Sequence, residues 1–191
     1  MIVITGGIGC GKSVVSQILR VMGYPVYDCD REARRLMADD PELREALANA
    51  FGQETFMADG SLNRAYLATR IFNDPGRLAQ MNAIVHPAVA RDIKRRRNAI
   101  GQERPFFVET AIYYESGFSH LIVADAVWCV AAPLELRIAR AMKRDNAPRA
   151  KVVERIDSQM PQEEKIALAD AVIWNDCTHS VIEQINSLLG N

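Results

Sequence analysis

The chain opens with Met1-Ile2-Val3-Ile4-Thr5-Gly6-Gly7-Ile8-Gly9-Cys10-Gly11-Lys12-Ser13 and continues in a segment with helical spacing that reaches Met22. An apolar run, a Gly-rich turn ending in Lys-Ser, and a helix together make the pattern of a phosphate-binding loop. The glycines let successive backbone N–H groups face an anion, and the helix directs its positive dipole end to the same place. The sequence therefore predicts a binding site for a nucleoside triphosphate.

Individual residues of this loop have expected roles. Lys12 should reach the β- and γ-phosphates, and the Ser13 hydroxyl should bind Mg²⁺. The Cys10 thiol lies next to a helix N-terminus, so we expect thiolate character and reaction with thiol reagents unless nucleotide shields it. The expected nucleotide-binding residues of the loop are Gly7, Ile8, Gly9, Cys10, Gly11, Lys12 and Ser13.

Size and composition narrow the class of protein. With 191 residues, 49% of them hydrophobic, the chain can form one α/β domain with inserted subdomains. The formal net charge of −1 does not suggest a nucleic-acid or membrane-surface partner, so a small-molecule anion is expected. The four scattered cysteines argue against a disulfide framework or a structural zinc site. Without a leader pattern or a membrane-spanning run, we expect a cytoplasmic protein.

Five short apolar segments are typical of buried parallel strands, and helical patterns separate them. Strands are expected at residues 2–5, 25–28, 105–110, 126–131 and 171–174. Helices are expected at residues 12–22, 41–50, 62–72, 87–99, 134–144 and 180–189. This order predicts an α/β fold with a five-stranded parallel sheet.

No strand is predicted between residues 30 and 104, which indicates a helical insertion in the sheet domain. The Arg-rich stretch 144–159 lies between Pro148 and Pro161 and is expected to be a mobile lid. The nucleotide-binding core would then consist of residues 1–29, 105–143 and 160–191.

Two carboxylates, Asp28 and Asp30, follow the second predicted strand. Ligands of open α/β sheets gather at the carboxyl ends of the strands, and residues two apart in a strand share a face. We expect Asp30 to be the catalytic base that orients an alcohol and accepts its proton, with Asp28 supporting substrate binding. The alternative is that Asp30 only caps a helix beginning near Arg31.

Glu109 ends the third predicted strand, where phosphate-loop enzymes commonly place the acid that holds Mg²⁺ through water. That acid is usually Asp, so a structural carboxylate is the alternative. Glu115 is a second candidate acid in the same loop.

Arginines gather after the fourth predicted strand, where guanidinium groups can clamp a transferring phosphoryl group once a lid closes. We expect Arg140 and Arg144 to be catalytic and Arg155 to bind substrate, and we interpret Arg149 as a surface residue. A solvated helix face is the alternative for any one of them.

His86-Pro87 is expected to begin a helix, because Pro is favourable in the first turn. His86 either contacts a substrate or is a structural group. The same helix carries a basic face with Arg91, Lys94 and Arg95 at positions i, i+3 and i+4, and Arg96 and Arg97 lie beside it. This face either holds an anionic substrate or complements the helix dipole. Nucleic-acid binding is a third interpretation, but the total charge is near neutral and no aromatic residues are interleaved with the basic ones.

Seven motifs follow one another along the chain: ITGGIGCGKS at 4–13, GYPVYDCD at 23–30, NAIVHP at 82–87, YESG at 114–117, MKRD at 142–145, SQMP at 158–161 and ADAVIWN at 169–175. Together they resemble the dephospho-coenzyme A kinase family over nearly the whole chain. The ordered set is far more specific than the first motif, which many NTPases share. The resemblance implies a three-layer P-loop kinase fold with a helical substrate-binding insertion and a small lid.

The resemblance further implies transfer of the γ-phosphoryl group of ATP to the ribose 3′-hydroxyl of dephospho-coenzyme A. The family's catalytic acid falls on Asp30, His86 stands in its His-Pro motif, and Asn175 matches a position near the adenine. Two departures occur: Cys10 replaces the usual Ser, and ETAIYYE from Glu109 replaces the common Asp-x-Pro-Leu-Leu-Phe-Glu.

Other nucleotide-binding classes lack their signatures here. A GTPase-type switch would need Asn-Lys-x-Asp and Asp-x-x-Gly, and a transport ATPase would need Leu-Ser-Gly-Gly-Gln; the sequence contains none of them. The nearest rival is a kinase for another small acceptor, such as a nucleoside monophosphate. The helical insertion directly after Asp30 distinguishes the two interpretations.

Overall fold

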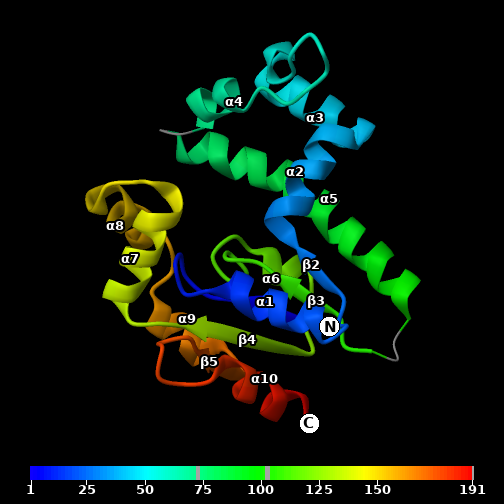
Figure 1. Ribbon diagram of the computed structural model, residues 1–191. Helices are drawn as coiled ribbons and strands as arrows, with labels where there is room; N and C mark the ends of the chain where they lie inside the picture. Colours follow the sequence, from blue (N-terminus) through cyan, green and yellow to red (C-terminus); the bar gives the residue numbers. More distant parts are fainter. Residues whose placement is uncertain (72–73, 102–103, 191) are drawn as a thin grey trace. The chain divides into compact units, whose positions relative to one another are not determined.

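A computed structural model describes residues 1–71, 74–101 and 104–190 of the chain (Figure 1). The chain divides into two compact units, one made of Met1–Asp28 with Gly101–Asn191 and the other of Cys29–Ile100. The predicted insertion at 30–104 overlaps the second unit, and the predicted lid at 144–159 falls in the first. That the one binds substrate and the other moves as a lid both stay predictions.

The first unit is built on a five-stranded parallel sheet with the strand order β2-β3-β1-β4-β5. Its strands are β1 (Ile2–Thr5), β2 (Val26–Asp28), β3 (Phe107–Glu109), β4 (Ala126–Ala131) and β5 (Ala171–Trp174). All five strands were predicted from apolar runs, and β1, β4 and β5 have the predicted bounds. The parallel α/β fold is therefore confirmed.

Helices surround this sheet: α1 (Lys12–Val21), α6 (Phe118–Leu121), α7 (Leu134–Asp145), α8 (Arg149–Asp157), α9 (Gln162–Leu168) and α10 (Val181–Leu189). The predictions for α1, α7 and α10 are confirmed to within one residue at each end. Helices α6, α8 and α9 were not predicted, and α8 occupies most of the stretch interpreted as a lid. In the part of the chain that is described, no helix is long and apolar enough to cross a membrane.

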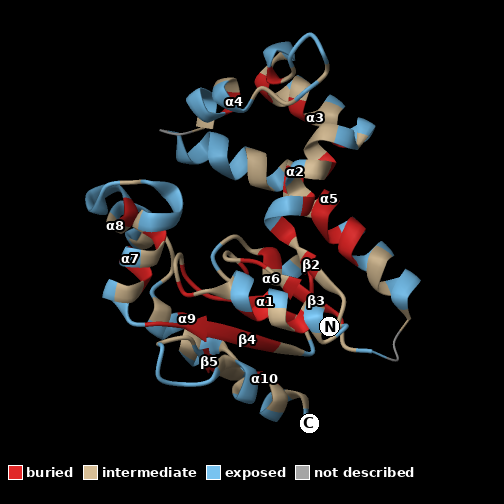
Figure 2. Ribbon diagram, in the orientation of Figure 1, coloured by how far each residue is buried: buried red, intermediate tan, exposed pale blue. Residues whose placement is uncertain are grey.

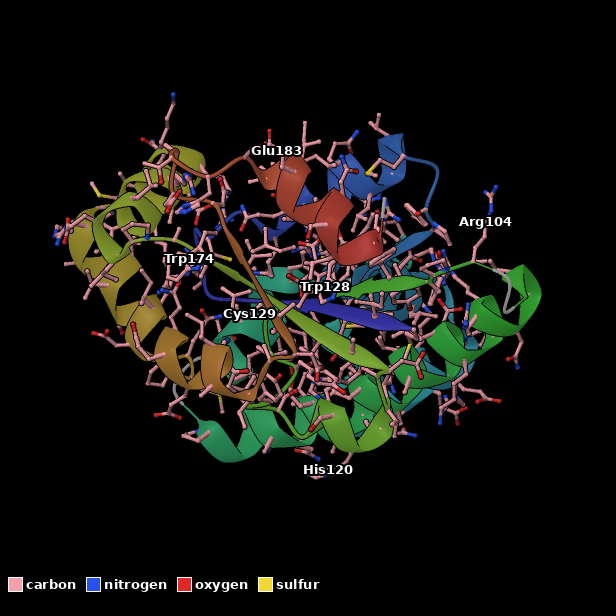
Figure 3. The ribbon with its side chains drawn as sticks, turned by 90° about the horizontal axis from the view of Figure 1, so that it is seen from below. Arg104, His120, Trp128, Cys129, Trp174 and Glu183 are labelled. Carbon is pink, nitrogen blue, oxygen red and sulfur yellow. The ribbon has the colours of Figure 1, made fainter. Side chains whose placement is uncertain are left out.

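Alternate residues of the central strands pack on opposite faces of the sheet. On one face, Ile4, Phe107 and Trp128 form a buried cluster with residues of α1 and α10. Figure 3 shows Trp128 on the α10 side of β4, and its neighbour Cys129 belongs to the other face. Helix α9 contacts β4 as well, so β4 is buried along almost its whole length (Figure 2).

The second unit consists of α2 (Cys29–Asp39), α3 (Pro41–Phe51), a 3₁₀ turn η1 (Gln53–Thr55), α4 (Arg64–Ile71) and α5 (Pro75–Ile100). Helix α5 contacts α2, α3 and α4. Asp40 caps α3, because its side chain accepts a hydrogen bond from the Leu43 N–H at 3.1 Å. Among the described residues of this unit, the sole β pairing is an isolated bridge between Phe56 and Leu62.

Three predicted helix boundaries in the second unit need correction. The bridge at Leu62 delays the start of α4 to Arg64, and the predicted end at Phe72 lies outside the described residues. Helix α2 starts at Cys29, so Asp30 lies in its first turn and does not precede a helix that begins at Arg31.

The third correction concerns Pro87, which lies inside α5 because this helix already begins at Pro75. The prediction that His86-Pro87 starts a helix is wrong. Proline costs one helical hydrogen bond, but buried Val85, Ala88 and Val89 on both sides of it keep the helix packed.

Two buried carboxylates join α2 to α5 through arginines. Glu32 and Asp92, each 4% exposed, both pair with Arg35 and Arg96. Burial alone would raise the pKa of Glu32, but the Arg35 hydrogen bond and the Arg96 charge outweigh it and lower that pKa. The second unit therefore has an ionic layer within its helical packing.

Candidate active site

The phosphate-binding loop connects β1 to α1 in the first unit. Gly9 and Gly11 have φ of +78° and +97°, a region that L side chains rarely adopt, and Gly11 directly precedes α1. The Lys12 ammonium donates hydrogen bonds to the carbonyl oxygens of Gly6 at 2.9 Å and Gly7 at 3.2 Å. Ser13 is exposed in the first turn of α1. The loop thus has the backbone that its sequence predicts.

Helix α7 packs against this loop, and Arg137 makes its closest contacts. A Cβ at Gly9 would collide with the Arg137 carbonyl oxygen, and a Cβ at Gly7 would collide with the Arg137 guanidinium. The Nε of Arg137 donates a hydrogen bond to the Ile8 carbonyl oxygen at 3.0 Å. Two loop glycines are therefore needed for close packing against α7. Sequence reasoning missed Arg137, which is buried beside Ile138 on the face of α7 that also buries Ala141.

Asn175 and Arg140, two predicted site residues, meet at the end of the loop. Asn175 Nδ2 donates a hydrogen bond to the Cys10 carbonyl oxygen at 3.0 Å, and a Cβ at Gly11 would collide with it. Arg140 donates to the Asn175 backbone oxygen at 2.9 Å and to its Oδ1 at 3.3 Å. Arg140 therefore orients Asn175, and Asn175 supports the loop.

Cys10 does not have the environment expected of a reactive thiol. The residue is 0% exposed and belongs to the apolar cluster that one face of the sheet forms with α1 and α10. The prediction that thiol reagents reach Cys10 is wrong, since the side chain points inward. Of the four free cysteines, Cys177 is the exposed one.

Asp28 and Glu109 lie side by side where β2 and β3 end, because the strand register pairs these two residues. Burial raises the pKa of the Glu109 carboxyl, and the neighbouring Asp28 carboxylate raises it further. A cation near this pair would favour the charged form of Glu109. Among the described residues, no group of three or more His, Cys, Asp and Glu side chains forms a metal site.

Glu115, the second candidate acid, is occupied by a structural contact. It pairs with the fully buried Lys165 at 2.5 Å and accepts a hydrogen bond from the Met160 N–H at 3.2 Å. The Lys165 ammonium also donates to the Ala111 carbonyl oxygen at 2.8 Å. Glu115 therefore fastens the loop after β3 to α9, and a metal-binding role is not supported.

Arg144 and Arg155 share one acid in the segment predicted to be a lid. Both donate to Asp145, at 2.7 Å for Arg144 Nε and 2.7 Å for Arg155 Nη1, and the Arg144 and Arg155 hydrogen bonds lower the pKa of Asp145. Arg149, interpreted as a surface residue, is exposed and pairs with Glu135. Just beyond α8, the Gln159 side chain accepts a hydrogen bond from the Ile8 N–H at 2.9 Å. The predicted lid segment is thus linked to the phosphate-binding loop.

In the second unit, Asp30 is exposed in the first turn of α2, where the helix dipole favours a carboxylate. His86 is partly buried within α5, and burial lowers its pKa. Of the basic face, Arg95 and Arg96 are paired with Asp92 and Glu32. These two arginines therefore have a structural role in the helical unit, as partners of its buried carboxylates.

A family model described as dephospho-CoA kinase matches residues 1–180. A curated dephospho-CoA kinase from Bacteroides fragilis is 43% identical over 186 residues, which cover 97% of this chain and 89% of the relative.

Two solved structures resemble the chain over nearly its whole length. TT1252 from Thermus thermophilus superposes with a TM-score of 0.83 at 36% identity, covering 99% of this chain and 95% of that one. The dephospho-CoA kinase from Campylobacter jejuni superposes with a TM-score of 0.69 at 25% identity, covering 99% and 94%. With the family model matching nearly the whole length, the chain belongs to the dephospho-CoA kinase family.

Proposed function

We propose that this protein transfers the γ-phosphoryl group of ATP to the ribose 3′-hydroxyl of dephospho-CoA, giving CoA and ADP in the final step of CoA synthesis. The observation that carries the proposal is the family match over residues 1–180 together with a complete phosphate-binding loop. Asp28 and Asp30 are the proposed acceptor-side residues: Asp28 ends β2, and Asp30 stands two residues further along the chain. Ligands of open α/β sheets gather at the carboxyl ends of the strands.

Asp30 is the proposed base. Strand β2 lies two positions from β1, which corresponds to about 10 Å across a parallel sheet. A nucleotide bound at the loop and a hydroxyl bound at the carboxyl end of β2 can therefore belong to one reaction. The hydroxyl oxygen attacks the γ-phosphorus while its proton passes to Asp30, and the bond from phosphorus to the oxygen of the departing ADP breaks.

Lys12, Arg140 and Arg144 are the proposed positive groups around the phosphates. Lys12 is held at the loop carbonyls, and Arg140 is held at Asn175, which we propose lies near the adenine. Arg144 and Arg155 share Asp145, so binding of an anion by either arginine would compete with that acid. Asp28, His86 and Arg155 are the remaining proposed substrate-binding residues.

The residues present fit Mg²⁺, which would neutralise charge on the β- and γ-phosphates when bound. Mg²⁺ needs few protein ligands because phosphate oxygens and water complete its shell. The exposed Ser13 hydroxyl and the Asp28–Glu109 pair supply such oxygens. We propose Ser13 as a direct ligand and Glu109 as a ligand through water. The cytoplasmic location expected from the sequence stays a prediction.

The proposed function is tested by ADP release from ATP-Mg²⁺ with a panel of acceptors: dephospho-CoA, nucleoside monophosphates and shikimate. We expect turnover with dephospho-CoA about 100-fold faster or more than with the others, because we propose that the second unit selects the acceptor. Turnover with a nucleoside monophosphate and none with dephospho-CoA would overturn the proposal.

A further inference from the structure

Arg137 carries a positive charge that forms no ion pair with any residue the structure describes. It lies in α7, is 5% exposed, and donates one hydrogen bond, from Nε to the Ile8 carbonyl oxygen. No acid among the described residues pairs with it, whereas Arg144 and Arg155 both pair with Asp145. Buried arginines are rare unless they are paired. A ligand with negative charge is the natural partner for this one.

The free part of the guanidinium remains accessible. Neither Nη1 nor Nη2 of Arg137 donates a hydrogen bond to a described residue, and neither is among the buried polar atoms that lack a partner. Both nitrogens therefore keep contact with solvent although the side chain as a whole is buried. Nε fixes the guanidinium plane, and the two Nη groups stay available to an incoming anion.

A second cation lies at the same place in the loop. The Lys12 ammonium donates to the Gly7 carbonyl oxygen at 3.2 Å, and the Arg137 guanidinium packs so closely on Gly7 that a Cβ there would collide with it. Lysine at this position of a phosphate-binding loop reaches the β- and γ-phosphates. A group that shares Gly7 with Lys12 is therefore placed at the terminal end of the triphosphate.

We propose that Arg137 binds the γ-phosphoryl group of ATP as a second cation beside Lys12, while its Nε holds the Ile8 carbonyl. Charge spreads over the three peripheral oxygens of the transferring group, and planar N–H donors next to them stabilise it without reorganising. The inference rests on the proposed kinase function only in taking ATP as donor. It makes no use of the acceptor.

The test compares two nucleotides that differ by the γ-phosphate. Dissociation constants for ADP and for a non-hydrolysable ATP analogue, each with Mg²⁺, are measured by calorimetry for wild type, Arg137→Gln and Lys143→Gln. Glutamine keeps a donor for Ile8 but loses the charge. Lys143 is exposed on the same helix and serves as the matched control.

We expect Arg137→Gln to weaken binding of the ATP analogue by about 10-fold or more, as for loss of a charged hydrogen bond, and to change ADP binding by less than about 3-fold. Lys143→Gln should change neither. Equal weakening for both nucleotides would show that Arg137 only supports the loop and would overturn the proposal, as would no change at all.

A folding defect is distinguished by a second variant and by melting curves. Arg137→Lys keeps the charge and should retain most of the preference for the ATP analogue. Loss of that preference in Arg137→Lys and its retention in a folded Arg137→Gln would contradict the proposal. Because no acceptor is present, failure here is separate from failure of the acceptor assay.

Discussion

The phosphate-binding loop and the helical unit Cys29–Ile100 are held by different interactions. The loop is fixed by glycine backbone, by apolar burial of Cys10 and by side chains from distant elements, namely Arg137, Asn175 and Gln159. The helical unit combines leucine packing with the buried carboxylates Glu32 and Asp92 and their arginines. A side chain added at a loop glycine should therefore destabilise the loop, and removal of a buried carboxylate charge should destabilise the helical unit.

The largest effect is expected on kcat when Asp30 is changed, because Asp30 is the proposed base. Asp30→Asn should lower kcat by about 10²–10⁴, because the proton of the acceptor hydroxyl loses its base, while the Kd for ATP stays the same. Steady-state kinetics and nucleotide titration measure the two quantities. Asp39→Asn makes the same chemical change at the exposed end of α2 and should be silent. An unchanged kcat in Asp30→Asn would leave Asp30 a structural residue of the first turn.

The ionic layer of the helical unit is tested at Glu32. Glu32→Gln should lower the free energy of unfolding by about 3 kcal/mol, the low end for a broken buried ion pair, because Arg35 and Arg96 keep access to water. Urea unfolding measures it. Glu42→Gln changes an exposed residue of α3 in the same unit; this control should alter the free energy of unfolding by no more than about 0.5 kcal/mol. Equal effects of the two substitutions would show that the layer contributes little.

Alanine substitutions at two glycines with similar φ angles test how closely α7 packs on the loop. Gly9 and Gly23 have φ of +78° and +85°, but a Cβ at Gly9 meets the Arg137 backbone while Gly23 has nothing within 4 Å. Gly23→Ala should cost about 1–2 kcal/mol for the left-handed conformation alone. Gly9→Ala should cost more and should also weaken ATP binding. If the two variants lose equal stability and both bind ATP normally, α7 does not constrain the loop.

The same difference between the two regions explains which features could be predicted from the sequence. The five strands and the loop follow local rules, apolar runs and glycine spacing, so their prediction was confirmed. Arg137 was missed because an Arg-rich helix gives no sign of which guanidinium is buried. One signal was available: Arg137 stands four residues before Ala141, on the apolar face of α7.

The helical unit was less predictable because tertiary contacts override local signals there. A proline such as Pro87 normally marks the start of a helix, yet α5 continues through it because the residues around it are packed.

The prediction for Cys10 used its neighbours in the sequence, but the side chain belongs to the buried core. The roles proposed for Asp30, His86 and Arg155 depend on bound substrates and stay predictions.

The smallest expected effect is a pH-dependent change in the melting temperature when Glu109 is substituted. Because burial raises its pKa above 4.5, the folded chain binds this proton more tightly than the unfolded chain. Stability is therefore lost as pH rises from 4.5 through the folded pKa. Glu109→Gln should raise Tm by a few degrees at pH 8 and lose this advantage at pH 4, whereas Glu164→Gln, exposed in α9, should not. A Tm difference that does not depend on pH would contradict this account.

The central claim is that one bound ATP phosphorylates a ribose hydroxyl of dephospho-CoA. The most direct measurement is the identity of the product, by mass spectrometry and ³¹P NMR after incubation with ATP-Mg²⁺ and dephospho-CoA. We predict stoichiometric ADP and a product with one additional phosphate, attached at the 3′-oxygen. Recovery of unchanged dephospho-CoA while ATP is converted to ADP and free phosphate would contradict the claim.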